Sequence, residues 1–401
     1  MRADEGGPEV KYWVGFDVAK AFHWASVVDD EGNEVLSRRV EATEEDLAAL
    51  CSEIARLGGE RRVGIDLVGG PAALLEALLF EQGERIFHVP GVAVNRARDA
   101  YGSEAKSDPR DARIIADQLR LRWRSLPEVR LRGEAAAEVR ALVGHRRDLV
   151  QEQTRRIARL RGLLSEVFPG LEAALNLTRK GALLVVTKAA RPAAVRGLGQ
   201  ARLARWLKAR GVRKAHELAG RVLGAAQAQR RELPAAEAKA TLAAEIATEI
   251  LRAKERLAAL DARLEDLVTQ DPKGAIVMSL PGMGVVLTAE FLAEAGDVRC
   301  FGSADRLAAA AGIAPVLRSS GAISYRRRAR RGNKDLKDVF YRSALYALPH
   351  HETSKSFYRR KRDEGKGHHQ AVLALARRRV NVLWAMLRDG RAYKEQTAKA
   401  A

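Results

Sequence analysis

Short apolar runs separated by polar turns occupy the first 91 residues, a pattern typical of strands interspersed with helices. Residues 11–20, KYWVGFDVAK, predict a buried strand, and two apolar runs on either side of Asp30–Asn33 predict a hairpin over residues 23–40. Apolar residues at helical spacing follow Thr43, which is suited to capping a helix over residues 43–57. A strand, a helix that starts at Pro71 and a further strand are predicted next, over residues 61–70, 71–83 and 84–91.

The predicted order is therefore three strands, helix, strand, helix, strand. An antiparallel meander followed by alternating helices and strands is the ribonuclease H arrangement, which RuvC-type resolvases share. The expected fold class of the N-terminal domain is therefore α/β, RNase H-like (RuvC-like). Because a fold alone does not determine a chemistry, the function has to be argued from particular side chains.

Long amphipathic helices dominate the pattern after residue 131. Apolar residues recur three and four apart over residues 133–168 and again over residues 234–270, where the helix ends before Asp271-Pro272. Two such helices predict an antiparallel hairpin or coiled coil. We expect three domains: a RuvC-like domain, a helical coiled-coil spacer and a mostly α-helical C-terminal domain, over residues 1–130, 131–272 and 273–401.

Residues 279–298 resemble a helix-hairpin-helix element, in which a glycine turn joins two helices. Gly282 and Gly284 in this turn would let backbone N–H groups approach DNA phosphates, which gives contacts that do not depend on base sequence. An ordinary tight turn between helices is the alternative interpretation.

The net charge of +19 is unevenly distributed over the 401 residues. Residues 1–70 hold 8 Lys and Arg against 15 Asp and Glu, whereas residues 318–394 hold 21 Lys and Arg against 6 Asp and Glu. The overall excess indicates a polyanionic partner, with nucleic acid as the first candidate. An acidic segment in such a chain is expected if some of its carboxylates hold cations against phosphate.

Cysteine content and hydropathy exclude several classes of protein. With only Cys51 and Cys300, the chain has neither a disulfide framework nor a thiolate zinc module, and a cytoplasmic, nucleoid-associated location is expected. The longest apolar runs are interrupted by Lys or Arg, so no membrane span is expected. Aromatic residues make up only 5%, which argues against a single-strand binder built on base stacking.

Four aspartates are candidates for metal binding. Asp17 and Asp66 each interrupt an apolar strand, and the two strands are neighbours in an RNase H arrangement. Asp108 and Asp111 lie three apart at the start of a predicted helix. Carboxylates from three elements can converge on Mg²⁺, which supports phosphodiester cleavage. Taken singly, each acid also has a structural explanation as a cap, a first-turn acid or a solvated strand end.

The sequence Ser319-Ser320-Gly321 lies in the basic segment. A serine hydroxyl is a poor nucleophile at neutral pH, yet flanking guanidinium groups and a metal-bound phosphate would favour its attack on phosphorus. The alternative is a turn whose arginines neutralise backbone phosphates, and chemistry alone leaves the choice open. The cations expected to contact nucleic acid are Arg318, Arg326, Arg327, Arg328, Arg330, Arg331 and Lys334.

Six motifs, taken in order, resemble those of one known family. They are GFDVAK, GIDLVGG, KSDPRDARIIA, SLPGMGVVLTAEFLAEAGD, AAAAGIAPVLRSSG and RRGNKDLK. These motifs look like those of the transposases of insertion-sequence family 110, and the match spans most of the chain. The K-x-D-x-x-D-A element together with the downstream S-G and R-G-N elements makes the resemblance specific.

The resemblance implies a RuvC-like domain with an acidic DEDD tetrad and a C-terminal transposase domain with a nucleophilic serine. Carried over by motif, the serine is Ser320, with Ser319 as the fallback, and the tetrad is Asp17, Asp66, Asp108 and Asp111. The second acid of the family is usually Glu in a pattern like E-A-T-G-G-Y, whereas Asp66 in DLVGGP is one methylene shorter. The shorter side chain could shift the position or the affinity of the metal.

The resemblance also implies guidance by a structured non-coding RNA, the bridge RNA. It further implies a homo-oligomer, a dimer or tetramer, in which the acids of one protomer and the serine of another form a composite site. Nothing in the composition shows either property.

The predicted function is that of a transposase that cuts and rejoins double-stranded donor and target DNA. Mg²⁺ would be held by the acids, and Ser320 would form a transient phosphoserine link. A Holliday-junction nuclease would need the acids but no serine, and a non-catalytic nucleic-acid-binding protein would need neither. A tyrosine recombinase using Tyr325, Tyr341 or Tyr346 would leave the acidic strands unexplained.

Overall fold

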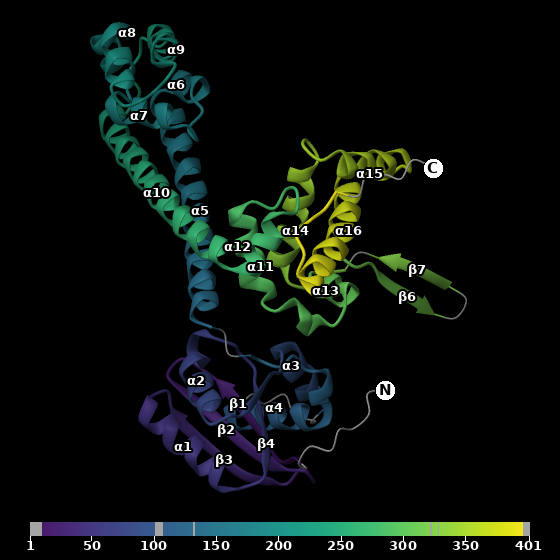
Figure 1. Ribbon diagram of the computed structural model, residues 1–401. Helices are drawn as coiled ribbons and strands as arrows, with labels where there is room; N and C mark the ends of the chain where they lie inside the picture. Colours follow the sequence, from purple (N-terminus) through teal and green to yellow (C-terminus); the bar gives the residue numbers. More distant parts are fainter. Residues whose placement is uncertain (1–9, 101–106, 131–132, 321–322, 328, 396–401) are drawn as a thin grey trace, which may run out of the picture. The chain divides into compact units, whose positions relative to one another are not determined.

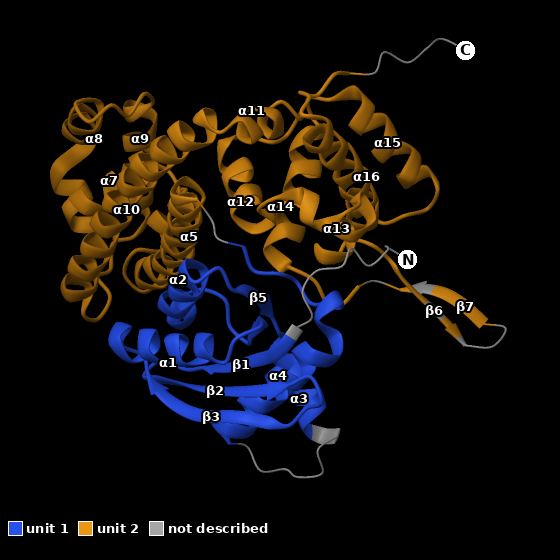
Figure 2. Cartoon of the chain, turned by 60° about the horizontal axis from the view of Figure 1, so that its bottom comes forward, with its two compact units in different colours: residues 1–132 blue, residues 133–401 orange. Residues whose placement is uncertain are grey.

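The chain forms two compact units, residues 1–132 and 133–401, in a computed structural model that describes residues 10–100, 107–130, 133–320, 323–327 and 329–395 (Figure 2). Each unit has its own hydrophobic core. None of the helices in these ranges combines the length and the apolar character needed to cross a membrane.

The first unit is a five-stranded mixed sheet with helices on both faces (Figure 1). The strand order is β3-β2-β1-β4-β5, in which β1 is antiparallel to β2 and parallel to β4. The predicted mixed α/β fold is confirmed, and the arrangement fits an RNase H-like domain. The strands are β1 (Val10–Val18), β2 (Phe22–Asp29), β3 (Glu34–Glu41), β4 (Glu60–Ile65) and β5 (Arg85–His88). The helices are α1 (Glu44–Arg56), α2 (Ala73–Glu81), α3 (Gly91–Ala100) and α4 (Asp108–Arg122), with 3-10 turns η1 (Gly70–Ala72) and η2 (Trp123–Ser125).

Local sequence explains how the helices of this unit begin. Thr43 caps α1 as predicted, because its Oγ1 accepts a hydrogen bond from the backbone nitrogen of Asp46 at 3.3 Å. Pro71 lies in η1 rather than at the start of α2, which begins two residues later at Ala73. The positive φ of Gly69 and Gly70 turns the chain out of β4 before the helix can start.

Side-chain alternation along the strands separates two cores. Val14 and Phe16 of β1 pack with α1 and α2 on one face of the sheet. Trp13 lies on the opposite face, in a core that it shares with Ala116 and Leu119 of α4. The odd-numbered residues at the end of β1 therefore lie on the face that α4 covers.

Two long helices, α5 (Glu134–Val167) and α10 (Ala236–Gln270), pack antiparallel in the second unit, where the sequence predicts long helices (Figure 1). Val139 and Val143 near the start of α5 contact Leu264 and Val268 near the end of α10. The opposite ends of both helices join a second core with α6 (Pro169–Ala174), α7 (Lys180–Lys188), α8 (Pro192–Lys208) and α9 (Ala215–Ala228).

A helical bundle follows α10, and a two-stranded hairpin extends from it (Figure 1). The bundle core contains Phe291, Phe340 and Leu383 from three different helices. The helices of the bundle are α11 (Pro272–Met278), α12 (Val285–Ala295), α13 (Ala304–Ala310), α14 (Lys334–Ala347), α15 (Glu352–Asp363) and α16 (His368–Asp389), with the 3-10 turn η3 (Val298–Phe301). The hairpin consists of β6 (Val316–Ser320) and β7 (Ile323–Arg327).

Candidate functional site

Two Gly-x-Asp sequences lie side by side in the sheet of the first unit. Gly15-Phe16-Asp17 of β1 and Gly64-Ile65-Asp66 at the end of β4 are in parallel register, with Gly15 opposite Gly64. Parallel strands bring residues at their carboxyl ends to the same edge of a sheet. The backbone nitrogen of Val18 donates a hydrogen bond to Asp66 Oδ1 at 3.1 Å, which ties the two strand ends together. The structure therefore places Asp17 and Asp66 at neighbouring positions, as predicted.

The two glycines let α4 lie close against this part of the sheet. A Cβ at Gly15 would overlap the backbone of Ala112 and Ala116, and one at Gly64 would lie 3.1 Å from Ile115 Cγ2. Trp13 contacts α4 further along, at Leu119, so α4 runs antiparallel to β1. The start of α4 therefore lies toward the strand end that carries Asp17.

The start of α4 supplies the other two predicted acids. Ser107 is the N-cap residue in an extended conformation, so Asp108 is the first helical residue and not the cap. Asp108 is half-buried, and Asp111 one turn further is only 3% exposed. All four predicted acids thus belong to β1, the end of β4 and the first turn of α4.

Asp111 is held by a residue that the sequence analysis did not single out. Arg98 of α3 donates from Nε to Oδ1 at 3.0 Å and from Nη2 to Oδ2 at 2.6 Å. Such a two-point guanidinium pair is among the stronger charged contacts in proteins. The pairing depends on how α3 packs on α4, and no local sequence signal identifies Arg98 among the neighbouring arginines.

The electrostatics of this edge favour a cation. Burial raises the pKa of the Asp66 carboxyl above its usual value, and the negative charge of Asp111 raises it further, whereas the hydrogen bond from Val18 lowers it. The donor set of carboxylate oxygens is the type that Mg²⁺ prefers. Among the described residues, however, no three His, Cys, Asp or Glu side chains are close enough to hold a metal ion. The chemistry of the acids fits a divalent cation, and Asp111 has to leave Arg98 to contribute both of its oxygens.

The predicted serines lie on the hairpin of the second unit. Ser319 pairs with Ser324, and Ser320 pairs with Ile323 next to the turn. Gly321, Arg328 and the side chains of Arg318, Ser320 and Arg326 lie outside the described residues. Of the other cations predicted to contact nucleic acid, Arg327 is half-buried, and Arg330, Arg331 and Lys334 are exposed.

The hairpin joins the bundle through two glycines in close contact. Gly312 and Gly332 both have a positive φ, and a Cβ on either one would overlap the backbone next to the other. The backbone nitrogen of Asn333 donates to the carbonyl oxygen of Ala310 at 2.7 Å, which closes the base of the hairpin. The glycine of the R-G-N element is thus explained by packing.

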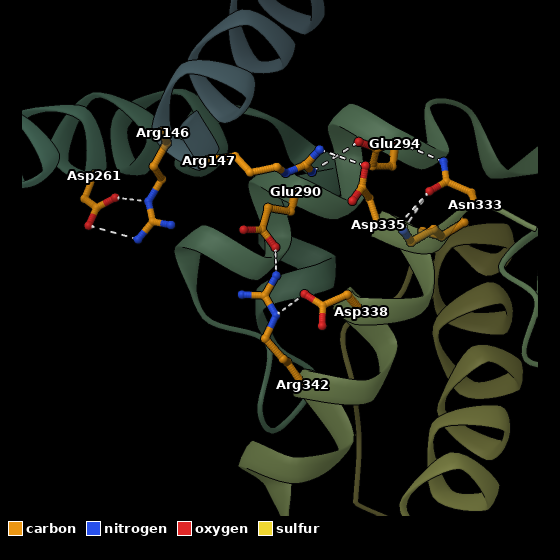
Figure 3. Close-up of polar contacts among 10 residues, drawn as sticks. Arg146, Arg147, Asp261, Glu290, Glu294, Asn333, Asp335, Asp338 and Arg342 are labelled. Carbon is orange, nitrogen blue, oxygen red and sulfur yellow. Dashed lines mark hydrogen bonds and ion pairs between the residues drawn. The ribbon is translucent and has the colours of Figure 1, made fainter. Parts of the chain in front are cut away.

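Asn333 links the base of the hairpin to an ion-pair network (Figure 3). Its Oδ1 caps α14 by accepting from the backbone nitrogens of Asp335 and Leu336, both at 2.9 Å, and its Nδ2 donates to Glu294 Oε2 at 2.8 Å. Arg147 of α5 contacts Asp335 at 2.7 Å and Glu294 at 3.4 Å. The network therefore anchors the hairpin base to α5 and α12, an arrangement the sequence analysis did not predict because its members lie far apart along the chain.

The two glycines of the predicted helix-hairpin-helix element have different environments. Gly282 has a φ of +83°, and a Cβ there would lie 2.5 Å from the carbonyl oxygen of Ser343. Packing against α14 is therefore enough to explain why this position is glycine, and no contact with DNA is needed to explain it. A Cβ at Gly284 would meet nothing within 4 Å, so that position remains open for a contact with phosphate.

Two family models cover the segments that contain these candidate residues. A model for transposases, of the DEDD type found in IS110 elements, matches residues 14–169, which include the four aspartates. The model for transposases of the IS116/IS110/IS902 family matches residues 274–359, which include the serine hairpin and the R-G-N element.

Several relatives align with the chain over nearly their whole length. The 42 kDa protein of insertion element IS900 from Mycobacterium paratuberculosis is 42% identical, covering 97% of this chain and 98% of its own length. The 44.8 kDa protein of IS116 from Streptomyces clavuligerus is 40% identical over 96% of each chain. The putative transposase of the IS117 mini-circle from Streptomyces coelicolor is 29% identical over 96% of each chain. The family resemblance of the motifs is confirmed: the chain belongs to the IS116/IS110/IS902 family of insertion-sequence transposases.

Proposed function

We propose that the chain cuts and rejoins DNA strands with two sets of residues, Mg²⁺-binding acids in the first unit and a serine nucleophile in the second. The acids are Asp17, Asp66, Asp108 and Asp111, and the nucleophile is Ser320, with Ser319 as the fallback. The observation that carries the proposal is the register of the two Gly-x-Asp sequences beneath the start of α4. This register brings the strand ends that carry Asp17 and Asp66 to the same edge of the sheet, toward which the start of α4 with Asp108 and Asp111 also lies.

A bound Mg²⁺ would neutralise charge on the phosphate oxygens and favour formation of an attacking oxygen. The four acids of the first unit would hold the ion, and Arg98 pairs with Asp111 when no ion is bound. Exposed Arg330, Arg331 and Lys334, which follow β7 at the base of the hairpin, bind the DNA backbone.

The covalent step proceeds by displacement at phosphorus. The Ser320 hydroxyl loses its proton as its oxygen bonds to phosphorus, and the bond from phosphorus to one deoxyribose oxygen breaks. That oxygen leaves with a proton. Attack on the phosphoserine by a hydroxyl of the second DNA strand then forms the new phosphodiester and restores the serine. The number of phosphodiester bonds is unchanged, so the reaction needs no other energy source.

Guidance by a bridge RNA and assembly into a dimer or tetramer are further parts of the proposal. They are supported by membership of the family and by the net charge of +19, which suits RNA as well as DNA. Purification of the protein from its native host, followed by sequencing of co-purifying RNA, tests the first. Light scattering on the protein with and without that RNA tests the second.

The metal role is tested by substituting Asp17→Asn and measuring cleavage of DNA that carries the ends of the element. We expect the variant, like the wild type in EDTA, to lose cleavage. Glu81→Gln is the matched control, because it neutralises an exposed carboxylate of α2 in the same unit. Activity that persists in EDTA contradicts the metal role, and cleavage without any protein–DNA adduct favours the nuclease alternative.

A further inference from the structure

A cavity of about 520 Å³ lies in the second unit, and none of its lining residues belongs to the hairpin. It is bounded by the end of α11, the start of α15, one face of α16 and the segment that follows α16. Its apolar wall includes Leu375, Val382 and Met386 of α16. A site of this volume, with an apolar wall and a few polar groups, is typical of small-molecule pockets.

A buried arginine without an ionic partner lines this cavity. Arg379 is only 4% exposed, and its Nε and Nη2 donate to Ser343 Oγ at 3.0 and 2.7 Å. Nη2 also donates to the carbonyl oxygen of Pro281. Among the described residues, no carboxylate pairs with Arg379 and no acceptor is bonded to its Nη1.

Arg379 remains charged despite its burial. Burial lowers the pKa of its guanidinium to about 10, which is still well above neutral pH. A charge that is removed from water and left without a counter-ion is unfavourable. An anion in the cavity would supply the missing partner.

Most of the other charged side chains that line the cavity would also attract an anion. Arg378, Arg391 and Lys394 line it and are exposed. Asp389 is the one carboxylate among the described lining residues, and Arg388 holds it through two hydrogen bonds of 2.6 and 3.1 Å. Cationic side chains therefore outnumber carboxylates around the cavity, even with Glu395, which lies 3.5 Å from the lining residue His351.

The segment that covers the cavity is held in place by hydrogen bonds. The backbone nitrogen of Tyr393 donates to Ser279 Oγ at 2.8 Å, and the Tyr393 hydroxyl lies 3.0 Å from His351 Nε2. His351 Nδ1 in turn lies 2.8 Å from Ser354 Oγ. The pocket is thus largely preformed, which lowers the entropic cost of binding a ligand.

We propose that this cavity binds a phosphate-bearing ligand of nucleotide size. The phosphate lies against Arg379 and the cations at the rim, and the apolar part of the ligand lies against Leu375 and Met386. The Nη1 group of Arg379 is left to donate to the phosphate, and the exposed guanidinium groups of Arg378 and Arg391 can each donate two parallel hydrogen bonds. The ligand is either a free nucleotide or a nucleotide at the end of a nucleic-acid strand. This proposal does not rest on the acids or on Ser320.

The test is calorimetric titration of the full chain with adenosine 5′-monophosphate and with adenosine. We expect the monophosphate to bind at least about tenfold more tightly, because the charged hydrogen bonds go to its phosphate. The triple variant Arg378→Gln, Arg391→Gln, Lys394→Gln should lose this preference. Its control is Arg221→Gln, Arg256→Gln, Arg359→Gln, which removes the same charge from exposed positions outside the cavity.

The remaining titrations separate the two sources of phosphate and test the buried arginine. A short oligonucleotide with a 5′-phosphate that binds more tightly than both its unphosphorylated form and the monophosphate would assign the site to a strand end. A monophosphate preference without this gain would assign it to a free nucleotide. Arg379→Met should abolish binding of the monophosphate if the variant folds. If it does not fold, the triple variant of Arg378, Arg391 and Lys394 still tests whether the cavity binds the phosphate. The proposal would be overturned if adenosine and its monophosphate bound equally well. It would also be overturned if the triple variant of the cavity and the control triple variant lost the same amount of affinity for the monophosphate.

Discussion

Arg98 binds both carboxylate oxygens of Asp111, at 3.0 and 2.6 Å, and so neutralises the most buried acid of the proposed metal site. The two side chains come from α3 and α4, on either side of the undescribed residues 101–106. A metal ion that uses both oxygens of Asp111 has to compete with this pair.

Substitution of Arg98→Gln is therefore expected to strengthen metal binding. Loss of a charged two-point pair worth about 1–2 kcal/mol should raise the affinity for Mn²⁺ or Mg²⁺ by roughly 5- to 30-fold. Calorimetric titration of the metal alone measures this change without DNA. Arg96→Gln, an exposed residue of the same helix, is the control and should leave the affinity unchanged. An unchanged or weaker affinity in Arg98→Gln would show that the pair does not compete with the metal.

Gly15→Ala should destabilise the first unit by about 1–3 kcal/mol, because the added Cβ overlaps the backbone of Ala112 and Ala116. The backbone of α4 would have to move away from β1. Gly91→Ala, where a Cβ meets nothing within 4 Å, is the matched control. Urea unfolding followed by tryptophan fluorescence measures both variants. Equal stability of the two variants would contradict the close contact between α4 and β1.

Arg342→Met should destabilise the second unit in a pH-dependent way. Glu290 is 7% exposed and ion-paired with Arg342, and burial raises the pKa of its carboxyl even with this partner present. An acid with a raised folded-state pKa favours its protonated form, so the folded state loses stability as the pH rises through that pKa. Removal of Arg342 should therefore cost about 2 kcal/mol at pH 8 and less at pH 5.

The pH dependence is checked by urea unfolding at the two pH values. Glu290→Gln in the Arg342→Met background should recover much of the loss at pH 8, because no buried charge is then left unpaired. Arg359→Met, at an exposed position of α15, provides the baseline. A cost that is the same at both pH values would show that Glu290 is not the group responsible.

The two cysteines should differ strongly in reactivity. Cys51 is 1% exposed in α1, and burial raises the pKa of its thiol to about 11, whereas Cys300 is exposed. The thiolate is the reactive form, so N-ethylmaleimide at pH 7.5 should label Cys300 first. Cys51 should be labelled only when the first unit unfolds locally or globally. Peptide mass spectrometry measures the labelling rates of the two cysteines. Similar rates at the two positions would contradict the packing of α1 on the sheet.

The sheet and the neighbouring positions of the strands that carry Asp17 and Asp66 could be predicted because both depend on local patterns. Alternating apolar residues define β1 and β4, and an RNase H order makes these strands neighbours. The same reasoning predicts α5 and α10, where the apolar spacing continues for many turns. The predicted start of α2 at Pro71 is two residues early, because Gly69 and Gly70 add a 3-10 turn that propensity does not reveal.

The partners of the candidate residues could not be predicted, because they depend on tertiary packing. Arg98 is one of several arginines in its segment, and only the packing of α3 on α4 selects it for Asp111. No local pattern shows why position 332 of the R-G-N element is glycine, whereas in the structure Gly332 is needed for close contact with Gly312, twenty positions earlier. The ion pair between Arg147 and Asp335 joins residues even further apart in the chain.

The most direct measurement for the proposed function is the covalent link between the protein and DNA. The purified protein, with its co-purifying RNA and Mg²⁺, is incubated with DNA carrying the ends of the element, and adducts are digested and mapped by mass spectrometry. We predict a phosphodeoxyribose group on Ser320, present in Ser319→Ala and absent in Ser320→Ala. An undiminished adduct in Ser320→Ala would contradict the assignment of the nucleophile.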